Sequence, residues 1–393
     1  MQRRSFLKAS GAVIVLVAGG GVWRAYDEGV FSVGQGPAYQ PWSDWQTENN
    51  GGPLALVRAA ILAASPHNTQ PWLFKITATQ VEVYADTGRF PGALDPYLRE
   101  QHIGLGCALE NLMLAAAANG YNAAATLLPG KLQGIPSNLQ PQLVARVDLS
   151  PGNRQTNELY NAIPHRHTNR SPYDLRKHVP ADVMDALSRV ASEESDVKIF
   201  LFTAESDRNR IIDVVAKANH DVYADQEVEQ GSQQWIRWSW SDVQKHRDGL
   251  TLDAIGLPPL TTAILKFTPK GLLKKYSPRG NGDPYADLLR ATPVFGLIAV
   301  RDRYDQEQSL RAGRIWQRAH LLLTSRGVAA RPINEAVELV DYQRMRNKEP
   351  RALAQLAEFT QDSSWQPTFM FRIGYPIRPA PPSPRRSVHD VIL

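Results

Sequence analysis

The chain has 393 residues, 43% of them hydrophobic and 21% charged, a balance typical of a globular protein and not of a disordered one. Its single cysteine, Cys107, excludes an internal disulfide and a cysteine-rich metal site. The formal net charge is +5, and three of these charges belong to Arg3, Arg4 and Lys8, which leaves +2 for the rest of the chain. So small an excess argues against nucleic-acid binding.

The first residues are typical of a targeting signal. Arg3 to Lys8 reads R-R-S-F-L-K, the twin-arginine pattern, and an apolar run of 15 residues follows from Ala9 to Trp23. That run is shorter than the roughly 20 residues of a membrane-spanning helix. No clear A-x-A cleavage site follows it. We therefore expect residues 1–30 to be an export signal, either cleaved or retained as an anchor; the alternative is a basic start of a soluble domain.

Two segments carry complementary polar motifs. Ser65 to Trp72 reads S-P-H-N-T-Q-P-W and closes an alanine-rich stretch, whereas Arg166 to Arg170 reads R-H-T-N-R. The first offers short polar side chains on a proline-restricted backbone, and the second offers arginines that match phosphate oxygens. Each half lacks what the other has: Arg58 is the only arginine shortly before the first motif, and the acidic segment 192–196, S-E-E-S-D, takes its place in the second half.

Two pairs of similar segments, in the same order along the chain, indicate an internal duplication. Gly106 to Gly120 and Gly313 to Gly327 lie 207 positions apart, and each predicts a helix with apolar residues at helical spacing and a glycine cap. The segments 141–147 and 367–373 both predict strands. The alternative is that alanine-rich helices resemble one another by composition alone.

The second half contains further motifs. The segment 331–335, R-P-I-N-E, follows its glycine-capped helix, F-R-I-G-Y-P occupies 371–376, and S-P-R-R occupies 383–386. An insertion at about 221–290 carries three tryptophans that either form a lid over a site or pack in a core: Trp235, Trp238 and Trp240.

Taken together, these motifs resemble the nitroreductase family of FMN enzymes, and more closely its long-chain Acg-type branch, over residues 53–388. The resemblance implies an α+β fold with a central antiparallel or mixed sheet in each half and helices around the sheets. Family members are homodimers with flavin at the subunit interface. A tandem copy therefore implies a monomeric pseudo-dimer, with a first half at 36–155 and a second half at 156–393.

The resemblance also implies that residues of both halves bind FMN. It assigns the phosphate to Arg166, Thr168, Arg170, Arg385 and Arg386. It assigns the isoalloxazine ring to Ser65, Pro66, His67, Asn68 and Gln70. It assigns Pro332, Ile333, Asn334 and Glu335 to the neighbourhood of flavin N5, where the backbone N–H groups that follow Pro332 would donate. Glu335 stands where the family has glycine, which puts ordinary redox reactivity in doubt. We expect one functional pocket where the halves meet and one abandoned pocket.

The function implied is that of an FMN-dependent oxidoreductase, with two-electron transfer through flavin N5 from a small-molecule donor to a nitroaromatic or quinone-like acceptor. No side chain is assigned as an acid–base catalyst because the flavin carries the chemistry, and no metal is expected. Export by the twin-arginine machinery would place the protein in the periplasm or on the outer face of the inner membrane, where NAD(P)H is scarce. The rival hypotheses are a non-enzymatic protein that sequesters FMN and an exported protein that has lost the cofactor.

Overall fold

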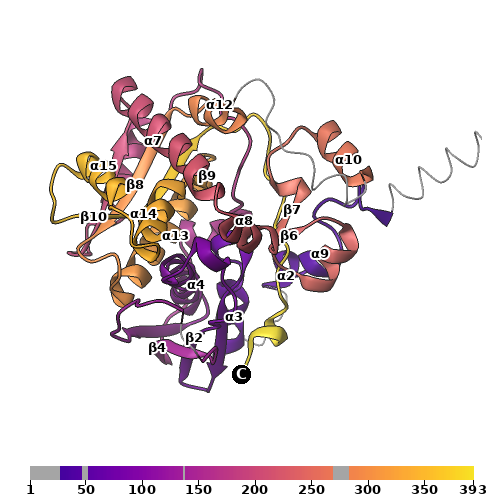
Figure 1. The fold of residues 1–393 in the computed structure, drawn as a ribbon. Coiled ribbons are helices and arrows are strands. Elements are labelled where there is room, and N and C mark those ends of the chain that lie inside the picture. Colours follow the sequence, from indigo (N-terminus) through magenta and orange to yellow (C-terminus); the bar gives the residue numbers. More distant parts are fainter. Residues whose placement is uncertain (1–26, 47–51, 136–137, 269–282) are drawn as a thin grey trace, which may run out of the picture.

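The computed structural model describes residues 27–46, 52–135, 138–268 and 283–393 (Figure 1). The twin-arginine motif and the apolar run that follows it lie outside these residues. The α-helices are α2 Pro41–Asp44, α3 Pro53–Ala60, α4 Arg99–Ala118, α5 Glu158–Ala162, α6 Ala181–Arg189, α7 Glu205–Tyr223, α8 Gln226–Gln233, α9 Trp240–His246, α10 Pro259–Phe267, α12 Pro284–Arg290, α13 Gln306–Ser325, α14 Glu335–Met345 and α15 Arg351–Thr360.

Two four-stranded sheets form the framework, and every strand pair in them is antiparallel. The first has the order β1-β2-β4-β3, formed by Trp72–Ile76, Gln80–Ala85, Gln142–Pro151 and Tyr121–Leu127. The second has the order β5-β8-β10-β9, formed by Val197–Phe202, Val294–Val300, Gln366–Gly374 and Ala329–Pro332. The expected α+β class with antiparallel sheets is confirmed.

The two sheets repeat one plan. In chain order each half contributes two strands, a long helix, a strand at one edge of the sheet and a strand that pairs beside it, so that α4 corresponds to α13 and β4 to β10. The predicted strand segments 141–147 and 367–373 fall on β4 and β10. The predicted glycine caps are confirmed as well, because Gly120 and Gly327 follow the two long helices with φ of 83° and 67°. This is the arrangement that duplication of one unit would produce.

The two long helices cross where each carries a glycine. A Cβ atom at Gly106 would overlap the Leu310 carbonyl oxygen, and one at Gly313 would overlap the Ile103 carbonyl oxygen. Each of these positions also lies 207 residues from its counterpart, so the contact is reciprocal, as at a two-fold interface between identical subunits. The absence of side chains at both glycines allows the helix backbones to approach this closely.

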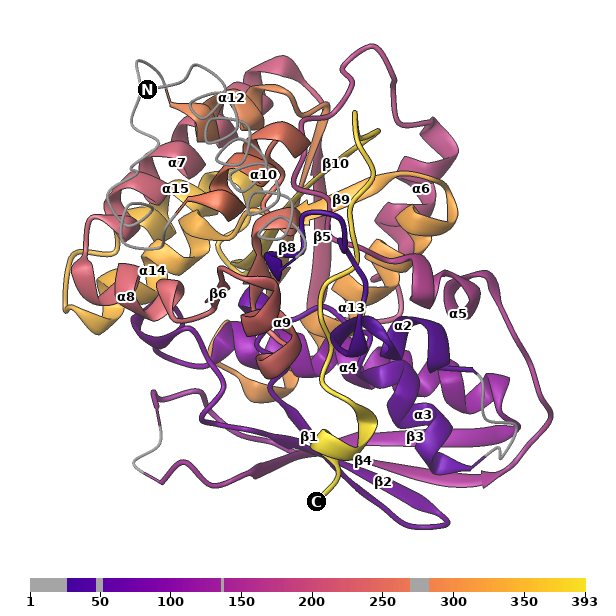
Figure 2. The same ribbon diagram turned by 90° about the vertical axis from the view of Figure 1, so that its right-hand side faces the viewer.

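The two sheets are covered differently. Exposure alternates along β3, so one face of the first sheet packs on the core beneath α4 and the other is open (Figure 2). By contrast, every residue of β8 is buried, because helices cover both faces of the second sheet. One hydrophobic core runs from the first sheet through α4 and α13 to the second sheet, and another lies under α7, α14 and α15. The two halves therefore share a core and do not form separate bodies.

The insertion contributes α8, α9, α10, α12 and a small parallel pair formed by β6 Ile236–Arg237 and β7 Leu250–Thr251. The indole Nε1 of Trp235 donates to the Phe90 carbonyl at 3.1 Å, which attaches the insertion to the first half. Leu250 of β7, and none of the three tryptophans, lines the cavity described below. No helix in the described parts of the chain is long and apolar enough to span a membrane.

Candidate functional site

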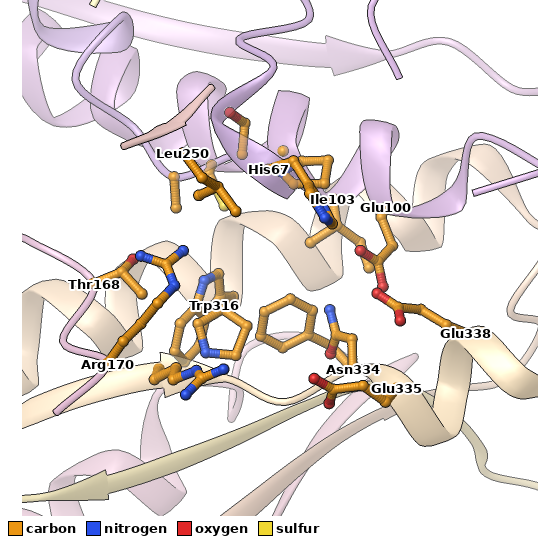
Figure 3. Close-up of a pocket in the computed structure, with 18 of the residues that line it drawn as sticks. His67, Glu100, Ile103, Thr168, Arg170, Leu250, Trp316, Asn334, Glu335 and Glu338 are labelled. Atoms are coloured by element: carbon orange, nitrogen blue, oxygen red, sulfur yellow. The ribbon is translucent and has the colours of Figure 1, made fainter. Parts of the chain in front are cut away.

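A cavity of about 190 Å³ lies between the two halves (Figure 3). The first half contributes one end of α4 and the turn before β1, and the second half contributes β9, β10, α13 and the start of α14. The lining residues are Ala64, Ser65, Pro66, His67, Glu100, Ile103, Gly104, Cys107, Thr168, Arg170, Tyr223, Leu250, Trp316, Arg331, Pro332, Asn334, Glu335, Glu338 and Phe369. Of the fourteen residues predicted from the sequence, this set contains Ser65, Pro66, His67, Thr168, Arg170, Pro332, Asn334 and Glu335.

The turn before β1 has an unusual backbone. His67, Asn68 and Gln70 have φ of 47°, 55° and 51°, in the left-handed region that residues other than glycine rarely adopt. The Ser65 Oγ accepts a hydrogen bond from the Gln70 N–H at 3.0 Å, which closes the turn. Gly104 of α4 leaves room for it, since a Cβ atom there would lie 3.1 Å from the Pro66 Cδ. Strain of this kind is typical of functional sites.

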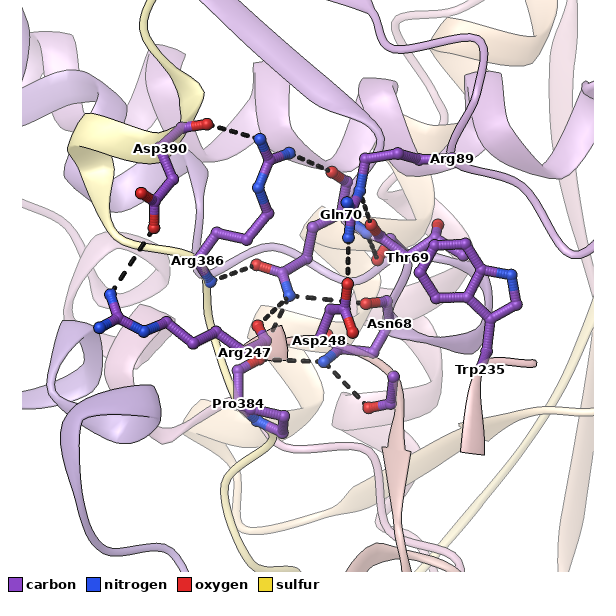
Figure 4. Close-up of polar contacts among 12 residues, drawn as sticks. Asn68, Thr69, Gln70, Arg89, Trp235, Arg247, Asp248, Pro384, Arg386 and Asp390 are labelled. Carbon is purple, nitrogen blue, oxygen red and sulfur yellow. Dashed lines mark hydrogen bonds and ion pairs between the residues drawn. The ribbon is translucent and has the colours of Figure 1, made fainter. Parts of the chain in front are cut away.

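Asn68 and Gln70 do not line the cavity, which corrects the expectation that they face the ring (Figure 4). The Asn68 Nδ2 donates to the Pro384 carbonyl at 2.9 Å, and its Oδ1 accepts from Arg385 at 2.6 Å. The Gln70 Oε1 accepts from the Arg386 N–H at 2.8 Å. Both amides are therefore used to attach the C-terminal segment to the first half, and Arg385 and Arg386 likewise lie outside the cavity lining.

His67 points into the cavity from the same turn (Figure 3). Its Nε2 lies 2.9 Å from the Ser232 Oγ. Burial, with a smaller contribution from Arg170, lowers the pKa of His67 to about 4, so the ring is neutral near neutral pH.

One end of the cavity is basic. Arg170 and Thr168 form its wall, and the guanidinium of Arg170 donates to the Ala254 carbonyl at 3.2 Å. Burial and then Arg331 and Arg372 lower the pKa of Arg170 to about 9, which leaves it charged near neutral pH. A second cavity of about 340 Å³ shares Thr168 and Arg170 as wall residues. This end therefore offers a cation reachable from two adjoining spaces.

Arg166 and Arg385 are buried outside the cavity lining, and each is 2% exposed. The Arg166 guanidinium donates to the Leu62 carbonyl at 3.0 Å, and that of Arg385 donates to the Ala63 carbonyl at 3.1 Å. Among the described residues neither has a carboxylate partner, and the Nε of each is unbonded. Burial lowers the pKa of Arg166 to about 10 and that of Arg385 well below its ordinary value. Two uncompensated buried cations favour an anion nearby.

The other end of the cavity is acidic, with Glu100 from α4 and Glu335 and Glu338 from α14 (Figure 3). Burial raises the pKa of Glu100 to about 8 and raises those of Glu335 and Glu338, and the like charges of Glu100 and Glu335 add to the effect at Glu338. The Oε2 atoms of Glu335 and Glu338 have no hydrogen-bond partner in the described structure. Glu100 is therefore largely protonated near neutral pH, and burial favours the protonated form of Glu335 and Glu338 as well.

The R-P-I-N-E segment joins β9 to α14. Pro332 and Asn334 line the cavity, but Ile333 is fully buried in the second core and its N–H donates to the Met370 carbonyl at 2.9 Å. The Ile333 N–H is therefore used by the sheet, which corrects the expectation that it faces the flavin. The Asn334 Oδ1 accepts from the Met370 N–H at 2.9 Å, which leaves its amide nitrogen on the cavity side (Figure 3).

Several wall residues were not predicted from the sequence. Glu338 lies one helical turn after Glu335, so the spacing itself could have indicated it once 335–345 was treated as a helix. Glu100, Cys107 and Trp316 belong to the two long helices, where they look like ordinary helix residues. The aromatic rings of Trp316 and Phe369 lie 4.8 Å apart and form an apolar wall between the two charged ends.

The corresponding place in the second half is occupied by charged side chains. Arg311 of α13 stands 207 positions after Gly104, and its guanidinium pairs with Asp196 and Glu307 at 2.5 and 2.8 Å. Glu194 lies 3.8 Å away. In the second half, the acidic segment after α6 therefore pairs with the side chain of Arg311. At the corresponding position of the first half, Gly104 has no side chain.

Replacing Glu338 with glutamine should change how stability depends on pH. A carboxyl with a raised folded-state pKa holds its proton while the unfolded chain loses it, so stability falls as pH rises from about 4.5 toward that folded pKa. Glu338→Gln removes this loss, which is at most about 1.4 kcal/mol per pH unit. We expect the variant to gain more in melting temperature near pH 8 than near pH 5. The exposed Glu229→Gln is the control, and parallel curves for Glu338→Gln and wild type would contradict the raised pKa.

No protein-family model matches the chain. The chain is 25% identical over 340 residues to "Putative NAD(P)H nitroreductase Rv3131" of Mycobacterium tuberculosis, which covers 85% of this chain and 88% of that protein. It is 31% identical over 120 residues to "Putative NAD(P)H nitroreductase acg" of the same organism, 30% of this chain and 34% of that one. The longer similarity supports a place in the nitroreductase superfamily.

Solved structures of nitroreductases also show limited similarity. The FMN-dependent nitroreductase NfnB from Mycobacterium smegmatis, in complex with NADPH, is 14% identical, with a TM-score of 0.36 over 59% of this chain and 96% of that one. A Bacteroides fragilis nitroreductase with bound FMN is 14% identical, with a TM-score of 0.32 over 56% of this chain and 89% of that one. TM-scores this low do not by themselves establish a shared fold.

Proposed function

We propose that this chain is an FMN-dependent oxidoreductase of nitroreductase type, with FMN in the cavity between the two halves. The observation that carries the proposal is the cavity itself: residues of both halves meet there, and the wall at one end contains Arg170, which has no carboxylate partner among the described residues. The similarity to proteins named as NAD(P)H nitroreductases over most of the chain supports it.

The residues present fit the cofactor. A flat ring is accommodated by the apolar wall of Trp316, Phe369 and Ile103. At about 190 Å³ the cavity alone is smaller than the roughly 300–1,000 Å³ of ordinary ligand sites, but the adjoining space of about 340 Å³ meets it at Thr168 and Arg170. We propose that the ring occupies the first space and that the phosphate lies at this shared wall.

Arg170 is the residue that we assign to the phosphate, with Thr168 beside it. Its guanidinium makes one hydrogen bond to a carbonyl, so its remaining N–H groups can donate to phosphate oxygens. Arg166 and Arg385 are further buried cations outside the cavity lining, and their charges would add to the positive potential. A bound dianion would also offset the cost of burying these cations.

When bound, FMN supplies the two-electron chemistry, and the protein supplies position and electrostatics. The amide of Asn334 and the start of α14 face the ring site from below, while His67 faces it from the turn before β1 and Ile103 faces it from α4 (Figure 3). Burial raises the pKa of Glu335 and so favours the neutral form of its carboxyl, which reduces the negative charge placed against the ring. Glu335 in the position of the family's glycine is thus compatible with an active enzyme.

The absorption spectrum of the purified protein tests this proposal. We expect flavin bands at about one FMN per chain, bleaching by NAD(P)H and reoxidation by a nitroaromatic or a quinone. Bound flavin that neither donor nor acceptor changes would instead support sequestration of FMN. A colourless protein that does not retain added FMN would rule out both.

We further propose export by the twin-arginine route, to the periplasm or the outer face of the inner membrane. The R-R-S-F-L-K motif at residues 3–8 and the apolar run after it support this. Fractionation of cells that produce the full chain, followed by detection of the protein in each fraction, would check it.

A further inference from the structure

Helix α10 shows its apolar side to the outside of the molecule. Leu260 and Ile264 are 74% and 57% exposed, whereas Thr262 and Lys266 on the opposite side are 6% and 8% exposed. Both pairs are spaced by four residues, so each forms a stripe along one face. A surface helix of a globular protein has the reverse arrangement, with the polar face outward. The outer face of α10 therefore requires an apolar neighbour.

Polar contacts hold the helix in this orientation. The buried Lys266 Nζ donates to the Gly29 carbonyl at 3.0 Å and pairs with Asp253 at 2.8 Å. Rotating α10 to bury Leu260 and Ile264 would break both interactions and leave Asp253 without this partner. The exposed apolar face is thus a consequence of specific contacts on the inner side.

Two other apolar residues lie near the helix but on its inner side. Val33 and Leu257 are 42% and 37% exposed, and they line a cavity together with Thr262 and Lys266. We therefore restrict the name α10 face to Leu260 and Ile264. Two large apolar side chains exposed one turn apart on the same helix face differ from the scattered single exposures that are normal on a protein surface.

The apolar run at the N-terminus constrains where this face lies. Trp23 ends that run, and Gly29, which contacts Lys266, follows six residues later. Six residues span at most about 22 Å when fully extended. If the run enters a membrane, α10 must lie close to the membrane surface. Figures 1 and 2 place α10 away from the first sheet. The first sheet would therefore lie on the side of the protein that points away from the membrane.

We propose that the α10 face docks on the surface of a lipid bilayer. With nine residues α10 is too short to span a membrane, but an apolar helix face of this kind can lie in the interface between headgroups and acyl chains. This contact would orient the protein in addition to holding it. The proposal does not depend on whether the central cavity binds FMN.

Site-specific labelling of the full chain tests the proposal. Cys107 is 1% exposed and burial raises its pKa, so it should resist labelling. The variants Leu260→Cys and Ile264→Cys would carry an environment-sensitive fluorophore at the α10 face. Ser150→Cys, at an exposed position of β4 on the first sheet, is the matched control. Each is mixed with vesicles of phosphatidylethanolamine and phosphatidylglycerol, with or without brominated lipid, after circular dichroism has shown that it is folded.

We expect vesicles to shift the emission of the labels at 260 and 264 to shorter wavelength, and brominated lipid to quench it, while the label at 150 stays unchanged. Vesicle binding without any change at 260 and 264 would mean that the N-terminal run alone attaches the protein, and would overturn the proposal. A blue shift without vesicles would overturn it too: one independent of protein concentration indicates that the chain covers its own face, and one that grows with concentration indicates a second copy.

Discussion

Arg170→Ala is expected to weaken FMN binding by about 1.5–3 kcal/mol, roughly ten- to a hundredfold in Kd, because a charge-assisted contact to the phosphate is lost. The side chain lines the cavity and donates to only one carbonyl among the described residues, so its removal should affect binding more than folding. Titration of the flavin-free variant with FMN, followed by flavin fluorescence, measures the change.

Two controls make this result specific. Arg176→Ala removes a guanidinium whose side chain is 91% exposed, and Arg58→Ala changes the first half's only arginine before its polar motif; both should leave the Kd for FMN unchanged. Arg166→Ala should weaken binding too, but it also removes the hydrogen bond to the Leu62 carbonyl and should lower stability. Greater sensitivity at Arg58 than at Arg170 would show that the one-pocket assignment is wrong.

Gly313→Ala should destabilise the whole protein. The added methyl group would overlap the Ile103 carbonyl oxygen and lie 2.9 Å from the Gly106 Cα, so α4 and α13 would have to separate. Overpacking of this kind typically costs about 1–3 kcal/mol, and we expect the upper part of that range because the obstacle is backbone and not a flexible side chain. The free energy of unfolding in urea measures the effect.

Gly88→Ala is the matched control, since the nearest atom to its added Cβ would be the Asp86 Oδ1 at 3.6 Å and its φ is not in the left-handed region. It should leave the unfolding free energy nearly unchanged. Gly106→Ala should resemble Gly313→Ala, because the contact is reciprocal. If both helix variants were as stable as wild type, the close crossing of α4 and α13 would be refuted.

The architecture was predictable because it follows local patterns. Gly120 and Gly327 predicted two helix ends, and the branched and aromatic segments at 141–147 and 367–373 predicted β4 and β10. Both signals depend on residues that are neighbours in the chain, and both occurred twice in the same order. The equal strand order of the two sheets then follows the same repeated plan.

The candidate site was predictable only in part. Ser65, His67, Thr168 and Arg170 reached the cavity wall, but Asn68 and Gln70 turned toward the C-terminal segment. Their orientation depends on the left-handed turn and on partners more than 300 positions away, such as Pro384 and Arg386. Neither a short sequence motif nor the spacing of apolar residues predicts the orientation of these two side chains.

By itself the sequence determined the class of fold, the repeated order of its elements and the kinds of residue available for an anionic cofactor, because each of these depends on short-range pattern and composition. Only the tertiary structure decided which of those residues share a cavity, that Glu100 and Glu338 form its acidic end, and that α10 faces outward with its apolar side. These features depend on which distant segments pack together, and burial then sets the charge state of Glu100 and Glu338.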